Sequence, residues 1–258
     1  MDNVDKFTTF ADRTVTLKQA SFIMREKNYL FGLLTIIFVA TVCVGLSSCV
    51  DDDDDEVETN YNPCPDDHHP HMIDLGLRSG TKWACCNVGA ATPEGTGGYY
   101  AWGETEENDG YDWKSYKFWT DQNGDGKVDY DEIADLGSDI AGTSYDVAHV
   151  KWGGSWVMPS FDQIEELAKK CTHVWTVRNG TKGMTFIGPN GNTIFLPAAG
   201  GRWGGILNNA DHNGYAWSSS KGLSVMDGAC CLCFDKGNVY CIDGDYRSYS
   251  VGVRPVSK

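Results

Sequence analysis

The sequence has 258 residues, a formal net charge of −15 at pH 7 and 41% hydrophobic residues. This composition allows a buried core and excludes a disordered chain, and the acidic excess repels nucleic acid, so we expect no nucleic-acid partner. The 30 glycines, 9 tryptophans and 12 tyrosines favour a loop-rich, aromatic-rich fold over a helical bundle.

The first feature along the chain is an apolar run, Tyr29–Leu46, which follows two basic residues and ends at Ser-Ser-Cys49. Basic residues, an apolar run and small residues before a cysteine are typical of a secretory signal peptide with a lipidation site. We therefore expect residues 1–48 to be a signal peptide, with Met24 as an alternative start, and Cys49 to carry the lipid. A plain membrane anchor is the other interpretation, because the run is almost long enough to span a bilayer.

The next segment, residues 49–71, is predicted to be a tether and linker. Its acidic run, Asp51–Glu58, repels itself and stays extended, and it resembles the export signal of surface lipoproteins of Bacteroidetes; a merely solvated spacer is the alternative. We expect a protein anchored in the outer membrane by its lipid and displayed at the cell surface. The polar end of the linker has the residues of a weak metal site, which we do not expect to be physiological: Asp66, Asp67, His68, His69 and His71.

The remaining cysteines lie in an oxidising compartment if the protein is exported, and their pairing cannot be read from the sequence. Cys230 and Cys233 have a C-x-x-C spacing, but no second pair or spaced histidine pair follows, so we expect no zinc site there. The cysteines in question are Cys64, Cys85, Cys86, Cys171, Cys230, Cys231, Cys233 and Cys241.

The segment Asp121–Glu132 reads DQNGDGKVDYDE and has the spacing of an EF-hand calcium loop, with Gly126 at its sixth position. Its carboxylates would repel one another without a cation, so we expect structural Ca²⁺, bound weakly at about 0.1 to 1 mM. We also expect a short helix over Tyr130–Leu136. An acidic turn that matches by chance is the alternative. The predicted ligands are Asp121, Asn123, Asp125, Lys127 (through its carbonyl), Asp129 and Glu132.

Two helices, a hairpin and a closing strand are predicted in the second half of the chain. Ser160 and Gln163 form a capping box before an apolar-periodic helix that ends at Cys171, and a shorter helix covers Tyr145–Val150. Met184–Leu196 reads as a hairpin around Pro-Asn-Gly-Asn, and Ser250–Val256 reads as a strand.

Six stretches of the chain are distinctive and together span nearly all of residues 72–258: IDLGLRSGTKWACCNVGA, YYAWGET, SDIAGTSYDVAHVKWGGSWVMPS, IFLPAAGGR, YAWSSS and SVGVRPV. In this order they resemble one family, the Fibrobacter succinogenes major paralogous domain. That family is similar to the C-type-lectin-like fold, which it shares with formylglycine-generating enzymes and with variable proteins diversified by retroelements. The resemblance implies an α+β architecture with two helices against a small twisted antiparallel sheet, paired first and last strands, and long irregular loops. The calcium loop is then an insertion in this domain.

We expect the domain to be a binding or adhesion module for a glycan or protein ligand, and not an enzyme. Aromatic, amide and carboxylate side chains suit either kind of ligand. Trp156 and Trp217 are predicted to lie in the core, whereas Trp203 and Tyr246 are predicted to be exposed. The candidate ligand-binding residues are Trp203, Asn208, Asn209, Asp211, His212, Asn213, Tyr215, Tyr240, Asp243, Asp245, Tyr246 and Arg247.

Two alternatives stay open. A copper oxidase resembling the formylglycine-generating enzymes would need two thiolates in a cleft, and the late cysteines lack that family's four-residue gap. The C-terminal region could instead be a retroelement-diversified ligand-binding surface. Calcium-mediated sugar binding lacks its usual sequence signatures, and no Gly-x-Ser-x-Gly elbow of a hydrolase occurs.

Overall fold

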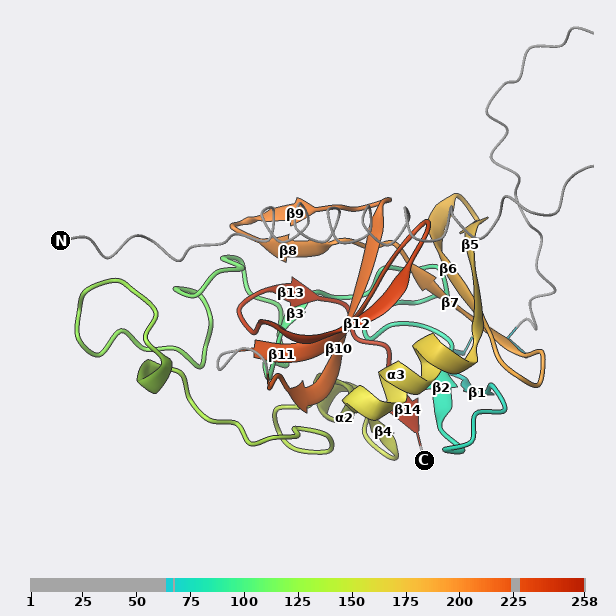
Figure 1. Cartoon of the computed structure of the whole chain (residues 1–258), viewed down its shortest axis with the longest axis horizontal. Coiled ribbons are helices and arrows are strands. Elements are labelled where there is room, and N and C mark those ends of the chain that lie inside the picture. Colours follow the sequence, from blue (N-terminus) through green and yellow to red (C-terminus); the bar gives the residue numbers. More distant parts are fainter. Residues whose placement is uncertain (1–63, 67, 224–227, 258) are drawn as a thin grey trace, which may run out of the picture. The chain divides into compact units, whose positions relative to one another are not determined.

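The computed structural model describes residues 64–66, 68–223 and 228–257 (Figure 1). The predicted signal peptide, its alternative start Met24, the lipidation site Cys49 and the acidic run lie outside these residues. The described part is a mixed α+β structure with two α-helices and four small antiparallel sheets. The resemblance implied one small sheet, whereas the strands of the described residues are divided among four.

The first two sheets both contain strands from distant parts of the chain. In one sheet the order is β1 (Met72–Asp74), β2 (Lys82–Ala84), β14 (Val256–Ser257) and β4 (Trp156–Val157). In the other it is β3 (Tyr100–Ala101), β13 (Ser250–Val251), β8 (Gly201–Trp203) and β9 (Ile206–Asn208).

The other two sheets are three-stranded meanders. One contains β5 (Thr172–Arg178), β6 (Thr181–Ile187) and β7 (Thr193–Pro197), and the other contains β10 (Asn213–Lys221), β11 (Gly228–Asp235) and β12 (Val239–Tyr246). The predicted hairpin is confirmed as β6 and β7, whose turn includes Gly191 at φ 87°. Here Gly188 N–H donates to the Asn192 carbonyl across 2.8 Å.

The predicted closing strand is divided into two. β13 pairs with β3 and β8, whereas β14 pairs with β2 and β4. The intervening residues cross between the sheets and include Pro255, which has no N–H to donate to a ladder. The last strand therefore pairs with β2 and not with the first strand, β1.

Both predicted helices are present. In α3 (Phe161–Lys170) the Ser160 side chain accepts from Gln163 N–H and the Gln163 side chain accepts from Ser160 N–H, so the capping box is confirmed. α2 spans Val147–Trp152, two residues later than predicted, because the Asp146 side chain caps its N-terminus. Gly153 ends α2 at φ 65°.

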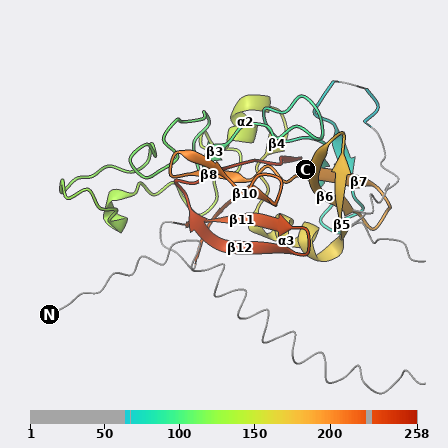
Figure 2. The same ribbon diagram turned by 90° about the horizontal axis from the view of Figure 1, so that it is seen from above.

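The main core lies between α3 and the two meanders. Ile164 and Leu167 of α3 pack with Leu232 and Phe234 of β11, and this cluster extends to Trp83 of β2 (Figures 1 and 2). Trp217 is buried in the described structure, as is Trp156, so the prediction that both are core residues is confirmed.

The insertion with the EF-hand-like loop is the green segment that extends away from the sheets in Figure 1. It has a small core of its own, in which Tyr116 and Ile133 pack with Ala101 of β3 and Val128 lies at the edge. The predicted helix over Tyr130–Leu136 is shorter than expected, a single 3₁₀ turn at Tyr130–Glu132 (η1). The chain leaves η1 by a bridge between Ile133 and Trp119, so the loop is closed by a strand-like pair.

Candidate functional site

Four partly exposed aromatic side chains lie in a row, and we call them the aromatic surface. Trp203 comes from β8, Tyr246 from the end of β12, Tyr249 from the turn before β13, and Trp113 from the insertion. The turn is closed by a hydrogen bond of 3.0 Å from Tyr249 N–H to the Tyr246 carbonyl. Three parts of the chain that are distant in sequence thus contribute to one surface.

Ring contacts connect these four side chains. The Trp203 and Tyr249 ring centroids are 5.3 Å apart at an interplanar angle of 30°. Tyr249 and Tyr246 are 5.4 Å apart, and Tyr246 and Trp113 are 6.2 Å apart, both with edge-to-face geometry. Such pairs contribute about 0.5 to 1.5 kcal/mol beyond their buried area, so the rings hold one another in place. The result is a rigid, partly exposed aromatic platform.

The structure places the predicted ligand-binding residues in two groups. The first group contains Trp203, which is partly exposed, and the residues Asn208–Asn213 that follow it along the chain. The second group lies on β12 and directly after it, and it includes Tyr246. Tyr249 contacts both Trp203 and Tyr246 and so joins the groups. Asn209, Asp211 and His212 are exposed, whereas Asn208, Asn213, Tyr240, Asp243 and Asp245 are partly buried.

Two of the predicted ligand-binding side chains are buried, which corrects the expectation for them. Arg247 stacks its guanidinium over the Trp102 ring at 5.3 Å and donates to the Ala134 carbonyl at 3.3 Å. Tyr215 accepts a hydrogen bond from Asn209 Nδ2 at 3.1 Å, and burial raises the pKa of its hydroxyl. Tyr215 also packs edge-to-face against Trp203, with ring centroids 6.1 Å apart, and so supports the aromatic surface from beneath.

Asp243 also has a structural role. Its Oδ1 accepts from Leu223 N–H at 2.8 Å and lies 3.4 Å from the Cys230 thiol. These bonds tie β12 to the end of β10 and to β11. Its carboxylate is therefore engaged within the three-stranded sheet.

No family model matches the chain, and the comparisons with curated proteins and with solved structures found no match either. Within the described residues, no helix has the length and apolar character needed to cross a membrane.

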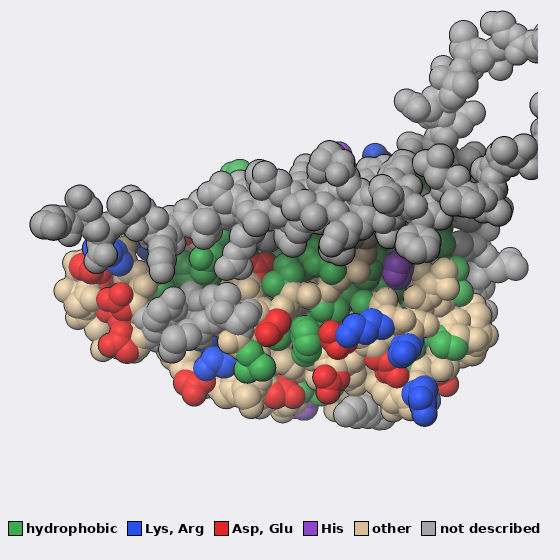
Figure 3. All heavy atoms as spheres, viewed as in Figure 1, with side chains coloured by type: hydrophobic (Ala, Val, Ile, Leu, Met, Phe, Trp, Pro, Cys, Tyr) green, Lys and Arg blue, Asp and Glu red, His purple; other side chains and the backbone are tan. Residues whose placement is uncertain are grey.

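The EF-hand-like loop has the internal hydrogen bonds of an ordered turn. Asp121 accepts from Gly124 N–H at 2.7 Å and from Gly126 N–H at 2.9 Å, and Asp125 accepts from Lys127 N–H at 2.8 Å. Gly126 has φ 72°, which favours glycine at the sixth position. Figure 3 shows Asp and Glu side chains gathered at the end of the described part that holds the insertion.

Glu132, at the twelfth position of this loop, is the buried member of the predicted ligand set. Its Oε1 accepts from Gln122 N–H at 2.8 Å, whereas its Oε2 is buried without a hydrogen-bond partner. An orphaned carboxylate oxygen is costly unless a cation or donor reaches it. The loop carboxylates of the described structure do not, however, converge within 4.8 Å as a group of three or more.

Two late thiols converge inside the protein. Cys231 and Cys233 Sγ are 3.1 Å apart on β11, on the side of the strand opposite Leu232 and Phe234. The hydrogen bond with Cys233, with burial, raises the pKa of the Cys231 thiol well above its usual value, so this thiol is protonated at neutral pH. All of the described cysteines are free thiols.

Sequence reasoning missed Trp113 and Tyr249. Each lies among other aromatic or polar residues, in YDWKSYKFWT and YRSYS, and only tertiary contacts distinguish them from their neighbours. A local signal was present for Tyr249, because it follows Tyr246 by three residues and closes the same turn.

Proposed function

We propose that the chain is a binding module with a C-type-lectin-like fold, held at the cell surface by a lipid on Cys49, and that its aromatic surface recognises a carbohydrate ligand. The row of ring contacts from Trp203 through Tyr249 and Tyr246 to Trp113 carries this proposal. Stacking on fixed aromatic rings suits the apolar faces of sugar rings, and rings already held in place lose little entropy on binding. A protein ligand is the other outcome of the test below.

We expect Trp203→Ala and Tyr249→Ala to weaken binding at least about tenfold, which corresponds to about 1.4 kcal/mol. The full chain is first applied to a glycan array, and its affinity for the strongest hit is then measured by tryptophan fluorescence. Trp152→Ala is the matched control, because Trp152 is also partly exposed but lies in α2 against Trp156. Equal affinities for all of these variants, or an array without a hit, would contradict carbohydrate recognition by this surface.

The calcium loop has a supporting role in this proposal. Glu132 is buried with one orphaned oxygen, and Val128 of the loop and Trp113 both pack against the small core of the insertion. Calcium at this loop would draw the loop carboxylates together, neutralise their charge and keep the insertion ordered. It would thereby hold Trp113 in place at the edge of the aromatic surface.

We expect chelation with EGTA to speed protease cleavage within residues 112–136 by about tenfold and to leave the rest of the domain intact, because local opening controls cleavage there. The Glu132→Gln variant should be cleaved, even in the presence of calcium, as fast as the wild type in EGTA. Asp131→Asn is the control, since it removes the same charge from an exposed, non-ligand position of the loop. Cleavage at the same rate with and without calcium would rule out a structural role for calcium in this loop.

A second candidate function is a copper oxidase, which is favoured by the buried Cys231 and Cys233 pair. One residue separates the two cysteines, whereas the paired cysteines of the formylglycine-generating enzymes have a four-residue gap. Copper that co-purifies with the chain and is lost in Cys231→Ala would favour this candidate over the binding module.

A further inference from the structure

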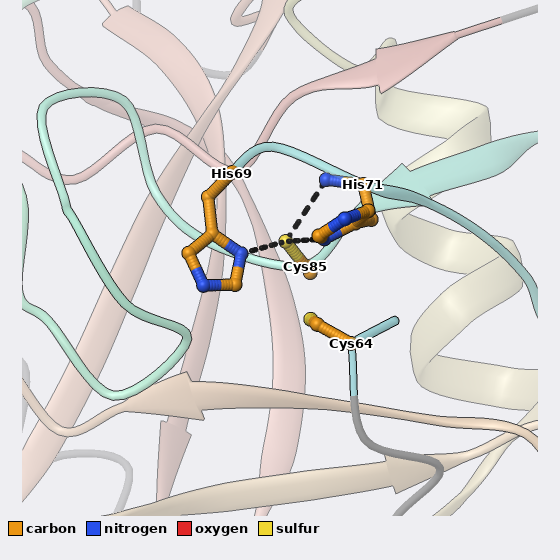
Figure 4. Close-up of side chains that lie close together, drawn as sticks. All are labelled: Cys64, His69, His71 and Cys85. Atoms are coloured by element: carbon orange, nitrogen blue, oxygen red, sulfur yellow. Dashed lines mark hydrogen bonds between the residues drawn. The ribbon is translucent and has the colours of Figure 1, made fainter. Parts of the chain in front are cut away.

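The described residues contain one group of converging metal-ligand side chains, formed by Cys64, His69, His71 and Cys85 (Figure 4). One ligand atom from each of the four lies within 4.8 Å of the others. From the sequence we expected something different, a weak and incidental metal site formed by Asp66, Asp67 and the linker histidines. That expectation included neither Cys64, which lies within the linker, nor Cys85, which lies outside it.

Strand pairing explains why the group forms. Met72 of β1 pairs with Ala84 of β2, so the preceding residue, His71, comes opposite Cys85, and Cys85 N–H donates to the His71 carbonyl at 3.0 Å. His69 lies two residues before His71 and approaches the same sulfur. Cys64, five residues before His69, lies beside His71 and Cys85 and completes the group (Figure 4).

The distances fit two ligands of one tetrahedral ion. Zinc–sulfur and zinc–nitrogen bonds of about 2.3 and 2.0 Å place a cysteine sulfur and a histidine nitrogen about 3.5 Å apart at a tetrahedral centre. In the structure, Cys85 Sγ is 3.3 Å from His69 Nδ1 and 3.8 Å from His71 Nδ1. The His71 backbone N–H also donates to Cys85 Sγ at 3.1 Å, so this sulfur is held at the centre of the group.

A neighbouring carboxylate fixes the orientation of one imidazole. His71 Nε2 lies 3.1 Å from Asp66 Oδ1, and because a carboxylate only accepts, Nε2 carries the proton and Nδ1 keeps its lone pair. That lone pair belongs to the nitrogen that faces Cys85. A carboxylate behind a ligating histidine is a recurrent feature of metal sites, where it orients the ring and raises its basicity.

We propose that Cys64, His69, His71 and Cys85 form a structural zinc site, with Asp66 as a positioning residue. Two cysteines and two histidines are a ligand set typical of zinc, and four protein ligands leave no open position for catalysis. The ion would fasten residues 64–71 to β2. The path of the chain into the domain would then be fixed at this point, independently of any ligand at the aromatic surface.

The test is metal analysis of the full-length chain, purified without chelators. We expect about one zinc per chain, and a cobalt-substituted protein with the visible absorption of tetrahedral Co²⁺ and thiolate charge-transfer bands. His69→Ala should lose the bound zinc while keeping the circular dichroism spectrum, since His69 precedes the first strand. His68→Ala is the matched control from the same segment and should keep it, because its side chain is 96% exposed.

Asp66→Asn should retain zinc but weaken its affinity about 10 to 100-fold, measured by competition with a chromophoric chelator. Cys85→Ser should also lose the bound zinc, because it removes the buried ligand. If Cys85→Ser fails to fold, the zinc content of His69→Ala decides the test. Equal zinc content in the wild type and His69→Ala would overturn the proposal. A Cys64–Cys85 disulfide, detected by mass spectrometry of the unreduced chain, would overturn it as well.

Discussion

Replacing Arg254 with methionine is expected to lower the free energy of unfolding by about 3 kcal/mol or more. The guanidinium is fully buried and donates to Asn87 Oδ1 at 2.8 Å, to the Ala84 carbonyl at 3.1 Å and to the Phe195 carbonyl at 2.8 Å. Methionine fills much of the volume but leaves three buried acceptors without a donor, at about 1 to 3 kcal/mol each. Urea denaturation followed by tryptophan fluorescence measures the change.

Arg254→Lys and Arg78→Met complete this experiment. Lysine keeps the charge but, as a single ammonium, cannot reproduce the planar fork that reaches β7 and the segment after β2 together, so we expect an intermediate loss. Arg78 is exposed, and its substitution should change the stability by less than about 0.5 kcal/mol. A similarly small change in Arg254→Met would show that the buried fork does not hold these elements together.

Asp146→Ala is the second substitution with a large expected effect, a loss of about 3 kcal/mol. This carboxylate is fully buried and accepts four backbone N–H groups. Its Oδ1 caps α2 by accepting from Ala148 and His149, and its Oδ2 accepts from Gly142 at 2.8 Å and Met158 at 3.0 Å. An N-cap alone contributes about 0.5 to 2 kcal/mol, and the two further amides add to it.

Asp146→Asn keeps the shape of the side chain but replaces one accepting oxygen with an NH₂ group. That group would face backbone N–H donors, so the variant tests whether the hydrogen bonds or the packing stabilise this region. We expect Asn to lose at least half as much stability as Ala. Asp162→Ala, in the exposed first turn of α3, is the control and should lose less than about 0.5 kcal/mol in the same thermal and urea scans. A nearly neutral Asp146→Ala would mean that other groups satisfy the four amides.

The elements predicted well from the sequence are those determined by local chemistry. The capping box at Ser160 and the apolar spacing that follows it predict α3, and the Pro-Asn-Gly-Asn turn predicts the β6–β7 hairpin. In both cases the residues that determine the element lie within a few positions of one another. The α2 helix begins two residues later than predicted because Asp146, whose side chain accepts from Ala148 and His149 N–H, is its N-cap.

The parts that could not be predicted depend on contacts between distant residues. Arg247 looks like a surface residue in its polar segment, yet it stacks on Trp102 more than a hundred residues away. The Cys64 and Cys85 ligands share no standard zinc spacing, and the register of β1 on β2, which places His71 opposite Cys85, cannot be read from the sequence. Two of the four residues of the aromatic surface, Trp203 and Tyr246, were predicted. Their residue types suggested a role in ligand binding, but the sequence does not show which aromatic side chains lie next to each other.

The position of β14 has a consequence for how the protein is made. Residues 256 and 257 lie between β2 and β4, so the sheet that they complete has no middle strand until they have been synthesised. β1 and β2 emerge from the ribosome long before that, and such long sequence separation between paired strands slows folding. This sheet can therefore assemble only after residues 256 and 257 are able to pair with β2 and β4, whereas each of the two three-stranded meanders needs only strands that follow one another along the chain.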